Sequence, residues 1–230
     1  MPDAFVPKRH APAPWLLKGR AFGVLAVLRK GGYAALRSTG PASSTRMRPR
    51  VVLLCAVEYT DSPVGPYSEV FSLVAPAEGG LNRAEVTHMH VDSEESTYWG
   101  RRNWAVPKQT SDIDLKWRAD RISADLTVAG EPACRIELSP PGRFGAFPVI
   151  LPAGIVRITQ PATGHRILTG LSGFGRVSLC RNGTVETLSD AMPSRSLFFP
   201  IAGFVVHRFT FTMETPTTSR HTDRYAGAVR

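Results

Sequence analysis

The chain contains 230 residues, with 28 lysines and arginines against 19 acidic residues, and carries a formal charge of +9. Residues 1–50 hold ten of the basic residues and one acid, so residues 51–230 carry 18 residues of each sign. A charge excess confined to the N-terminal fifth argues against a uniformly basic nucleic-acid-binding domain. A hydrophobic fraction of 43% excludes a disordered or collagen-like chain.

The longest apolar runs, Phe22–Leu28 and Val51–Val57, are much shorter than the ~18 residues that a transmembrane helix needs. The basic residues near the N-terminus have no apolar stretch directly behind them, so we expect no secretory signal. The three cysteines, Cys55, Cys134 and Cys180, lack a zinc-like spacing and are interpreted as buried reduced thiols. We therefore expect a cytoplasmic protein that contacts neither a membrane nor a specific nucleic acid.

Alternating apolar and polar residues predict strands along most of the chain. In chain order, these strands cover residues 22–28, 51–59, 68–74, 85–91, 112–117, 122–128 and 209–213. The dipeptide Asn182-Gly183 favours a tight hairpin between residues 177–181 and 184–188. The pattern predicts one antiparallel β domain, either a sandwich or a barrel.

Only one segment has a clear helical signal. Asp92 is predicted to be the N-cap, and Glu95, three residues later, completes a capping-box pattern that leads into residues 96–102. Residues 139–164 contain five prolines and are predicted to form a loop or a strongly interrupted strand. We therefore expect few short helices beside the strands.

A lysine with unusual surroundings follows this predicted helix. Trp104, Val106 and Pro107 precede Lys108 and form an apolar collar around it. Burial among such residues disfavours an ammonium ion, so we expect the Lys108 pKa to lie below that of a free lysine. A neutral buried amine is the group that Schiff-base chemistry on a ketone or aldehyde requires.

Three segments resemble the acetoacetate decarboxylase family. Gly100-Arg101-x-x-Trp104-x-x-Pro107-Lys108 is similar to the family's lysine motif, and Gly65-Pro66-Tyr67-Ser68-Glu69 to its Gly-x-Tyr-x-Glu segment. Pro14-Trp15-Leu16-Leu17-x-Gly19 resembles the opening strand of many members. The resemblance spans residues 13–215 and implies a cone-like antiparallel β-barrel, in a homo-oligomer, between a basic flexible arm (1–12) and a C-terminal tail (216–230).

The resemblance also implies roles for particular residues. Lys108 matches the Schiff-base lysine and Glu69 the active-site carboxylate, which would transfer protons or orient water. Arg20 falls near an N-terminal arginine of the family that would pair with a substrate carboxylate. Tyr67 and Trp104, within the two longer motifs, are assigned to substrate binding. The implied substrate is a small keto acid or aldehyde, and no cofactor or metal is expected.

The chain departs from the family's decarboxylases at three positions. Gln109, Arg102 and Leu54 stand where those enzymes carry a lysine and two glutamates. A second cation would help to lower the pKa of the nucleophilic amine, and a second acid would transfer protons. These differences favour aldol or dehydration chemistry through the same iminium over decarboxylation. A non-catalytic barrel that binds a carbonyl compound or an apolar ligand is a further alternative.

A metal site of the cupin type is a third interpretation. His88 and His90 alternate on a predicted strand, and Glu94 follows four residues later, which approaches the first cupin motif. The second cupin motif requires a histidine after a Pro-x-Gly, and this chain has Arg157 in that region. The two histidines are therefore interpreted first as ordinary residues of the barrel wall.

Overall fold

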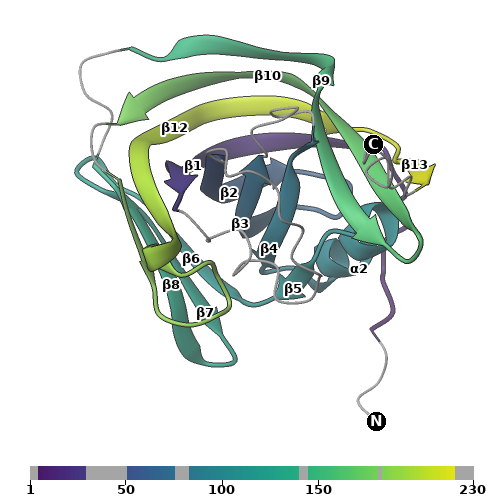
Figure 1. Ribbon diagram of the computed structural model, residues 1–230, viewed down its shortest axis with the longest axis horizontal. Coiled ribbons are helices and arrows are strands. Elements are labelled where there is room, and N and C mark those ends of the chain that lie inside the picture. The colour runs from purple at the N-terminus through teal and green to yellow at the C-terminus, as the bar shows by residue number, and fades with distance from the viewer. Residues whose placement is uncertain (1–4, 30–50, 76–82, 140–144, 181–182, 221–230) are drawn as a thin grey trace, which may run out of the picture.

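The computed structural model describes residues 5–29, 51–75, 83–139, 145–180 and 183–220. Strands account for most of this part of the chain (Figure 1). The strands are β1 (Trp15–Leu28), β2 (Val51–Asp61), β3 (Tyr67–Ala75), β4 (Glu85–Val91), β5 (Lys108–Thr110), β6 (Asp112–Trp117), β7 (Ile122–Val128), β8 (Glu131–Leu138), β9 (Phe147–Ala162), β10 (His165–Cys180), β11 (Gly183–Thr187), β12 (Phe198–Met213) and β13 (Thr217–Arg220). The helices are α2 (Glu94–Trp104) and a single 3-10 turn, η2 (Arg195–Leu197).

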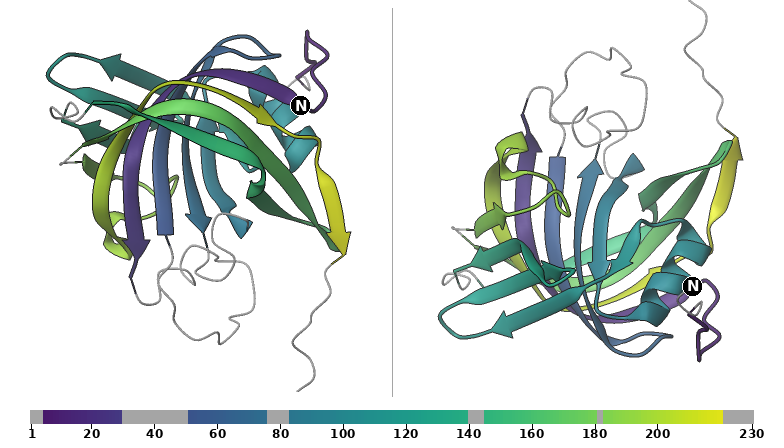
Figure 2. Two further views of the ribbon diagram at one scale, coloured as in Figure 1. Left: turned by 90° about the horizontal axis from the view of Figure 1, so that it is seen from above. Right: turned by 90° about the horizontal axis from the view of Figure 1, so that it is seen from below.

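Nine strands form one strongly curled sheet. Their order is β13-β10-β12-β1-β2-β3-β4-β5, and β9 pairs with β10 beside this path. All the pairings are antiparallel except that of β4 with β5. The curl brings β9 back to the start of β4, where Ala84 bridges Ile158 and the Thr159 N–H donates to the Ala84 carbonyl at 2.7 Å. This closure confirms the predicted mainly β, cone-like barrel, which Figure 2 shows from two sides.

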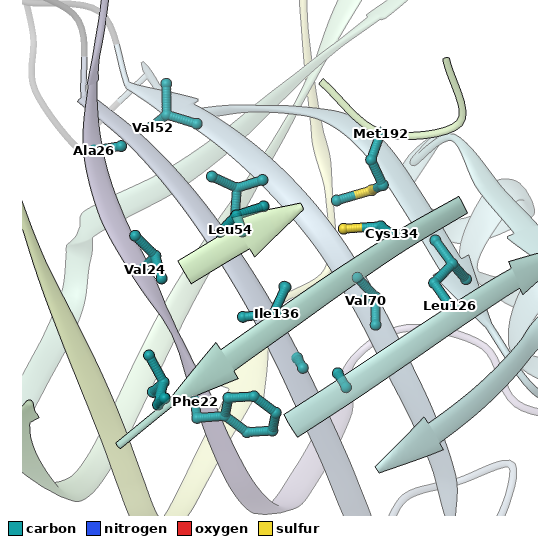
Figure 3. Packing of buried hydrophobic residues seen from close by; sticks show 14 of the residues in the cluster. Phe22, Val24, Ala26, Val52, Leu54, Val70, Leu126, Cys134, Ile136 and Met192 are labelled. Atoms are coloured by element: carbon teal, nitrogen blue, oxygen red, sulfur yellow. The ribbon is translucent and has the colours of Figure 1, made fainter. Parts of the chain in front are cut away.

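A second sheet, in the order β11-β8-β7-β6, packs against the outside of this barrel. Phe22, Val24 and Leu54 of the barrel wall are fully buried against residues such as Leu126 and Ile136 of the second sheet (Figure 3). We call this cluster between the barrel and the second sheet the outer core. Because side chains alternate along a strand, one face of β1 and β2 lies in the outer core. The other face of these strands is directed into the barrel.

Helix α2 begins one residue later than the sequence predicts. Ser93, rather than Asp92, is the N-cap, and its hydroxyl accepts a hydrogen bond from the Ser96 N–H at 3.2 Å. The Asp92 carboxylate instead accepts from the Ser68 N–H at 2.7 Å and so joins the start of the helix to β3. Serine and aspartate are both favourable N-cap residues. Because the Asp92 carboxylate binds the backbone of β3, Ser93 is the residue that caps the helix.

The hairpin expected at Asn182-Gly183 is not formed. Residues 181–182 lie outside the described residues, but the flanking strands belong to different sheets: β10 pairs with β9, β12 and β13, and β11 pairs with β8. The dipeptide therefore stands where the chain passes from the barrel to the second sheet. The predicted hairpin pairing is therefore wrong, because strands β10 and β11 do not pair with each other.

The proline-rich segment was expected to form a loop or a strongly interrupted strand, and its described part forms the second, as β9. β9 pairs with β10 on both sides of residues 152–155, which have no partner in this ladder, and it also makes the bridge at Ile158. Because β9 lies beside the main path of the sheet, its prolines cost few ladder hydrogen bonds. At the chain ends, β13 pairs with β10 and extends the barrel sheet beyond the expected boundary at residue 215. Residues 5–12 of the expected arm contact α2, where the Trp99 indole donates to the Arg9 carbonyl at 2.9 Å. Among the described residues, no helix has the length and apolar character that crossing a membrane requires.

Candidate active site

Strands on either side of β4 bring together Glu69 and Lys108, the two residues that the resemblance assigned to catalysis. Tyr67 and Glu69 lie two residues apart on β3 and therefore point to the same face of the sheet, into the barrel. Lys108 is the first residue of β5 and pairs with Met89 of β4, the strand between β3 and β5. The sheet order thus places Lys108 close to Glu69 inside the barrel.

Lys108 and Glu69 form a buried ion pair. The Lys108 Nζ lies 2.9 Å from Glu69 Oε2, and the two residues are only 4% and 3% exposed. Two opposite charges removed from water in this way strongly attract each other, but their desolvation is costly. The two residues that the resemblance assigned to catalysis therefore share one enclosed site.

Two further polar residues complete the site, and neither was identified from the sequence. The Lys108 Nζ donates to the Ser96 hydroxyl of α2 at 2.7 Å, and the Tyr59 hydroxyl of β2 donates to Glu69 Oε1 at 3.1 Å. Tyr67, which the sequence did indicate, accepts from Lys108 Nζ at 3.4 Å. Ser96 and Tyr59 lie within ordinary helix and strand patterns, so no sequence signal separates them from structural residues.

The glycine and arginine of the lysine motif have clear structural tasks. A Cβ atom at Gly100 would lie 2.6 Å from Cδ of Lys108, so only glycine leaves room for the lysine stem beside α2. The Arg101 Nε donates to the Lys108 carbonyl at 2.5 Å and holds β5 against the helix. This contact ties the end of the helix to the strand that carries Lys108.

The charge state of Lys108 differs from the expectation. Burial, the largest influence, lowers the Lys108 pKa, but the Glu69 carboxylate and the Tyr67 phenol raise it, and the net pKa lies above the ordinary 10.5. The predicted low pKa is therefore wrong for the ligand-free site. The sequence indicated the burial but not the direct contact with a carboxylate.

The two tyrosines of the site stay protonated. Burial, followed by the charge of Glu69, raises the pKa of Tyr59 well above 10.0. Burial also raises the pKa of Tyr67 to about 12, although the nearby Lys108 ammonium opposes the shift. Both phenols are therefore hydrogen-bond donors over the ordinary pH range.

A cavity of about 350 Å³ opens beside the ion pair. Its wall includes Tyr59, Tyr67, Glu69, Trp104 and Lys108, and most of the rest is aliphatic or aromatic. Trp104 is 1% exposed, and its indole N–H donates to the Glu214 carbonyl at 2.9 Å, so only its carbon surface is offered to a ligand. Tyr67 and Trp104 thus lie where the resemblance placed them.

Arg20 does not belong to this group. It lies on β1 but is not part of the cavity wall. Its Nε is 2.6 Å from Glu58 Oε2, and its guanidinium stacks 4.2 Å from the ring centre of Trp117 in the second sheet. The structure therefore does not bring Arg20 to the substrate position that the resemblance implied, because the neighbouring Ala21 occupies the inward side of the strand.

The three positions at which this chain differs from the family's decarboxylases also lie away from the cavity. Gln109 and Arg102 are exposed. Leu54 is fully buried in the outer core, while its neighbours Leu53 and Cys55 line the cavity. The residues of β2 that face the cavity therefore contribute no acid, whichever of them corresponds to the missing glutamate.

The residues of the cupin alternative are not gathered into a site. His90 is buried, and its two ring nitrogens contact the Ser111 hydroxyl and the Ala191 carbonyl, each at 2.9 Å. The His88 Nδ1 contacts the hydroxyls of Ser72 and Thr87. Within the part of the chain that the structure describes, no three His, Cys, Asp or Glu side chains are placed to hold a metal ion.

Comparisons with known proteins agree with this geometry. The family model for acetoacetate decarboxylase matches residues 41–181, more than half of the chain, and includes both the Tyr67–Glu69 and the Gly100–Lys108 segments. No curated protein matches the sequence.

Solved structures show the same fold at low sequence identity. Acetoacetate decarboxylase from Legionella pneumophila is 14% identical, with a TM-score of 0.65 over 95% of this chain and 92% of that one. The enduracididine biosynthesis enzyme MppR, in complex with pyruvate, is 14% identical, with a TM-score of 0.62 over 93% of both chains. An acetoacetate decarboxylase-like enzyme from Sphingomonas wittichii is 16% identical, with a TM-score of 0.60 over 92% and 94%.

Proposed function

Because the chain belongs to the acetoacetate decarboxylase family, we propose that Lys108 forms a Schiff base with the carbonyl carbon of a keto acid or an aldehyde. The observation that carries this proposal is the contact between Lys108 Nζ and Glu69 Oε2, 2.9 Å apart and both buried in the wall of one cavity. This arrangement supplies a nucleophile and a proton acceptor at the same point.

The first step is a proton transfer within the ion pair. Glu69 takes a proton from the Lys108 ammonium, so the pair becomes a neutral amine and a neutral carboxylic acid. A ligand that fills the cavity removes the remaining water, and a drier site disfavours the two charges relative to the neutral pair. The raised pKa of Lys108 in the ligand-free site is therefore compatible with a neutral amine in the complex.

The amine then adds to the carbonyl carbon. The lone pair of Nζ forms the new carbon–nitrogen bond, and a proton moves from nitrogen to oxygen to give a carbinolamine. Glu69 returns its proton to the hydroxyl group, which leaves as water, and the product is an iminium ion beside the Glu69 carboxylate. The Tyr59 hydroxyl, 3.1 Å from Glu69 Oε1, stabilises that carboxylate.

The iminium ion is an electron sink. Glu69 removes a proton from the adjacent carbon to give an enamine, or removes the proton of a β-hydroxyl so that the neighbouring carbon–carbon bond breaks and an aldehyde departs. Loss of carbon dioxide from a β-keto acid would leave the same enamine. Reprotonation and hydrolysis by one water release the product and restore Lys108.

Reductive trapping tests the proposal. Treatment of the full chain with cyanoborohydride and a panel of keto acids and aldehydes should convert the iminium to a stable secondary amine, which peptide mass spectrometry would locate at Lys108. Lys108→Met should abolish this adduct. Lys116→Met, which removes a half-exposed lysine of the second sheet, should leave it unchanged. Absence of an adduct on Lys108 over the whole panel would overturn the proposal.

One observation favours a second candidate, a non-catalytic barrel that binds a carbonyl compound or an apolar ligand. In the ligand-free site the Lys108 pKa is raised, so the amine rests as an ammonium ion that cannot attack a carbonyl group. If the ion pair persisted in the complex, the site would bind without reacting. In the same trapping experiment, this candidate predicts ligand binding with no covalent adduct.

A further inference from the structure

The polarity of the cavity is confined to one end. Thirty described residues line it, and the charged ones among them are Glu69 and Lys108, which already contact each other. The hydroxyls of Tyr59 and Tyr67 are also directed at this pair. Among the described residues of the wall, the polar side chains that a ligand meets therefore lie where its carbonyl group would react.

Among the described residues of the wall, the only cation is Lys108, and Glu69 already pairs with it, so none is left for a substrate carboxylate. Arg20 pairs with Glu58 outside the cavity, Arg101 contacts the Lys108 carbonyl, and Gln109 is exposed. A carboxylate bound beside Glu69 would place two anions against one ammonium ion in an apolar enclosure. An unpaired buried charge is strongly unfavourable, so this wall selects against anionic substrates.

The remainder of the wall is suited to a hydrocarbon. Side chains from β9, β10 and β12 form much of it and include Leu151, Leu171, Phe204 and Val206. The volume of about 350 Å³ corresponds to about a dozen water-sized groups, since one molecule occupies about 30 Å³ in liquid water. A cavity of this kind, mostly apolar with a few convergent polar groups, is typical of a site that buries most of its ligand.

We infer that the substrate is an uncharged aldehyde or ketone with an apolar body of about ten carbons, its carbonyl carbon beside Lys108 and its hydrocarbon in the far part of the cavity. The inference rests on the proposed function and narrows it: a lipophilic carbonyl compound takes the place of a short, charged keto acid. The chemistry that remains available is α-proton transfer and aldol or dehydration steps through the iminium, since such a substrate has no carboxylate to lose.

Straight-chain alcohols test the ligand class independently of Schiff-base formation, because an alcohol cannot form an imine. Calorimetric titration of the full chain with 1-alkanols of increasing length should show affinity rising about four-fold per methylene until the cavity is filled at about ten carbons. An affinity that does not rise with chain length would overturn the inference.

Trapping with cyanoborohydride tests the reacting end. Aldehydes of matching length should label Lys108 at lower concentration than pyruvate or acetoacetate, and preferential labelling by either keto acid would contradict the inference. If the alkanols bind as expected but no carbonyl compound labels Lys108, the proposed function fails while the apolar ligand class stands. The two failures are therefore distinguishable.

A pair of variants on one strand places the hydrocarbon in this cavity. Val206→Phe adds bulk to the cavity wall on β12 and should move the affinity plateau to shorter alkanols. Ile201→Phe, at an exposed position of the same strand, should leave the plateau unchanged. A plateau unaffected by Val206→Phe in the folded variant would contradict this placement. If that variant does not fold, the dependence of affinity on alkanol length in the wild type still tests the inferred ligand class.

Discussion

The buried pair of Lys108 and Glu69 is central to the stability of the site and to its proposed reaction. Each charge is nearly inaccessible to solvent and has the other as its counter-ion. Removal of one partner from such a pair leaves a buried charge without compensation and destabilises a protein by roughly 3–5 kcal/mol. In the proposed reaction, a proton passes between the two groups through this same contact when a ligand excludes water.

Replacement of Glu69 by glutamine should reverse the pH dependence that Lys108 contributes. In the wild type the folded-state pKa of Lys108 is raised above 10.5, so its contribution to stability is complete below pH 10.5 and is lost as the pH rises through the folded-state pKa. In Glu69→Gln the largest raising influence is gone and burial remains, so the Lys108 pKa falls. The variant should therefore be destabilised near neutral pH and recover as the pH rises toward 10.5.

Urea unfolding at a series of pH values measures this difference. The gap in free energy of unfolding between wild type and Glu69→Gln should be about 3 kcal/mol near pH 7 and narrow at alkaline pH. Glu58→Gln is the matched control, since it breaks the partly exposed pair with Arg20 and should cost at most about 1 kcal/mol. A gap that is constant with pH would show that Lys108 is not the titrating group.

Sequence reasoning at the residue scale was strongest where a motif exists. Lys108, Glu69, Tyr67 and Trp104 were predicted, and the structure gathers all four around one cavity. Ser96 was missed, because its contact with Lys108 depends on how α2 lies across β5 and not on any local pattern. The Lys108 pKa was mispredicted for the same reason: a neighbour from another strand determines it.

At the scale of elements, α2 fixes the lysine end of the site. The helix supplies the Ser96 hydroxyl, the space beside Gly100 and the Arg101 contact to β5. Its first turn is held by the Ser93 cap. The stability of this turn is therefore coupled to the position of the Lys108 amine.

Ser93→Ala should remove the cap and destabilise the protein by about 1 kcal/mol. The Ser93 hydroxyl accepts from the N–H of Ser96, the same residue whose hydroxyl contacts Lys108, so amide exchange at the start of α2 should also accelerate. Thermal unfolding and hydrogen exchange would measure the two effects. Ser194→Ala is the control, because it removes an equivalent cap from the short η2 turn. Unchanged exchange in α2 would contradict the assigned cap.

Element prediction was reliable where the pattern is local and failed where pairing is not. The strands predicted over residues 112–117 and 122–128 are formed, as β6 and β7, and they pair with each other. The turn signal at Asn182-Gly183 was misassigned because it joins two sheets. The prolines of β9 left a loop and an interrupted strand as alternatives, and the pairing with β10, broken at residues 152–155, shows the interrupted strand.

At the scale of the whole molecule, none of the described basic residues in the N-terminal fifth lines the cavity. Of the ten basic residues in the N-terminal fifth, Lys18 and Arg20 pair on the surface with Asp61 and Glu58. Lys30 and the four arginines from Arg37 to Arg50 lie outside the described residues. The charges that matter for the proposed reaction are those of the Lys108–Glu69 ion pair, which transfer of one proton from Lys108 to Glu69 would neutralise.

The whole barrel was predictable in class but not in its closure. Period-two patterns and the motifs indicated an antiparallel barrel, whereas the bridge between Ala84 and Ile158 joins segments more than seventy residues apart. This closure is what shapes the cavity and its apolar far wall. The inferred class of ligand therefore depends on the three-dimensional structure and not on a sequence pattern.

The most direct test of the central claim is exchange of the carbonyl oxygen. Each cycle of imine formation and hydrolysis at Lys108 replaces the oxygen of a ketone by one from water. A long-chain methyl ketone labelled with heavy oxygen should lose its label in the presence of the wild-type protein and of Lys116→Met. With Lys108→Met the loss should fall to the rate without protein. Label retained with the wild type, or lost equally with Lys108→Met, would contradict the account.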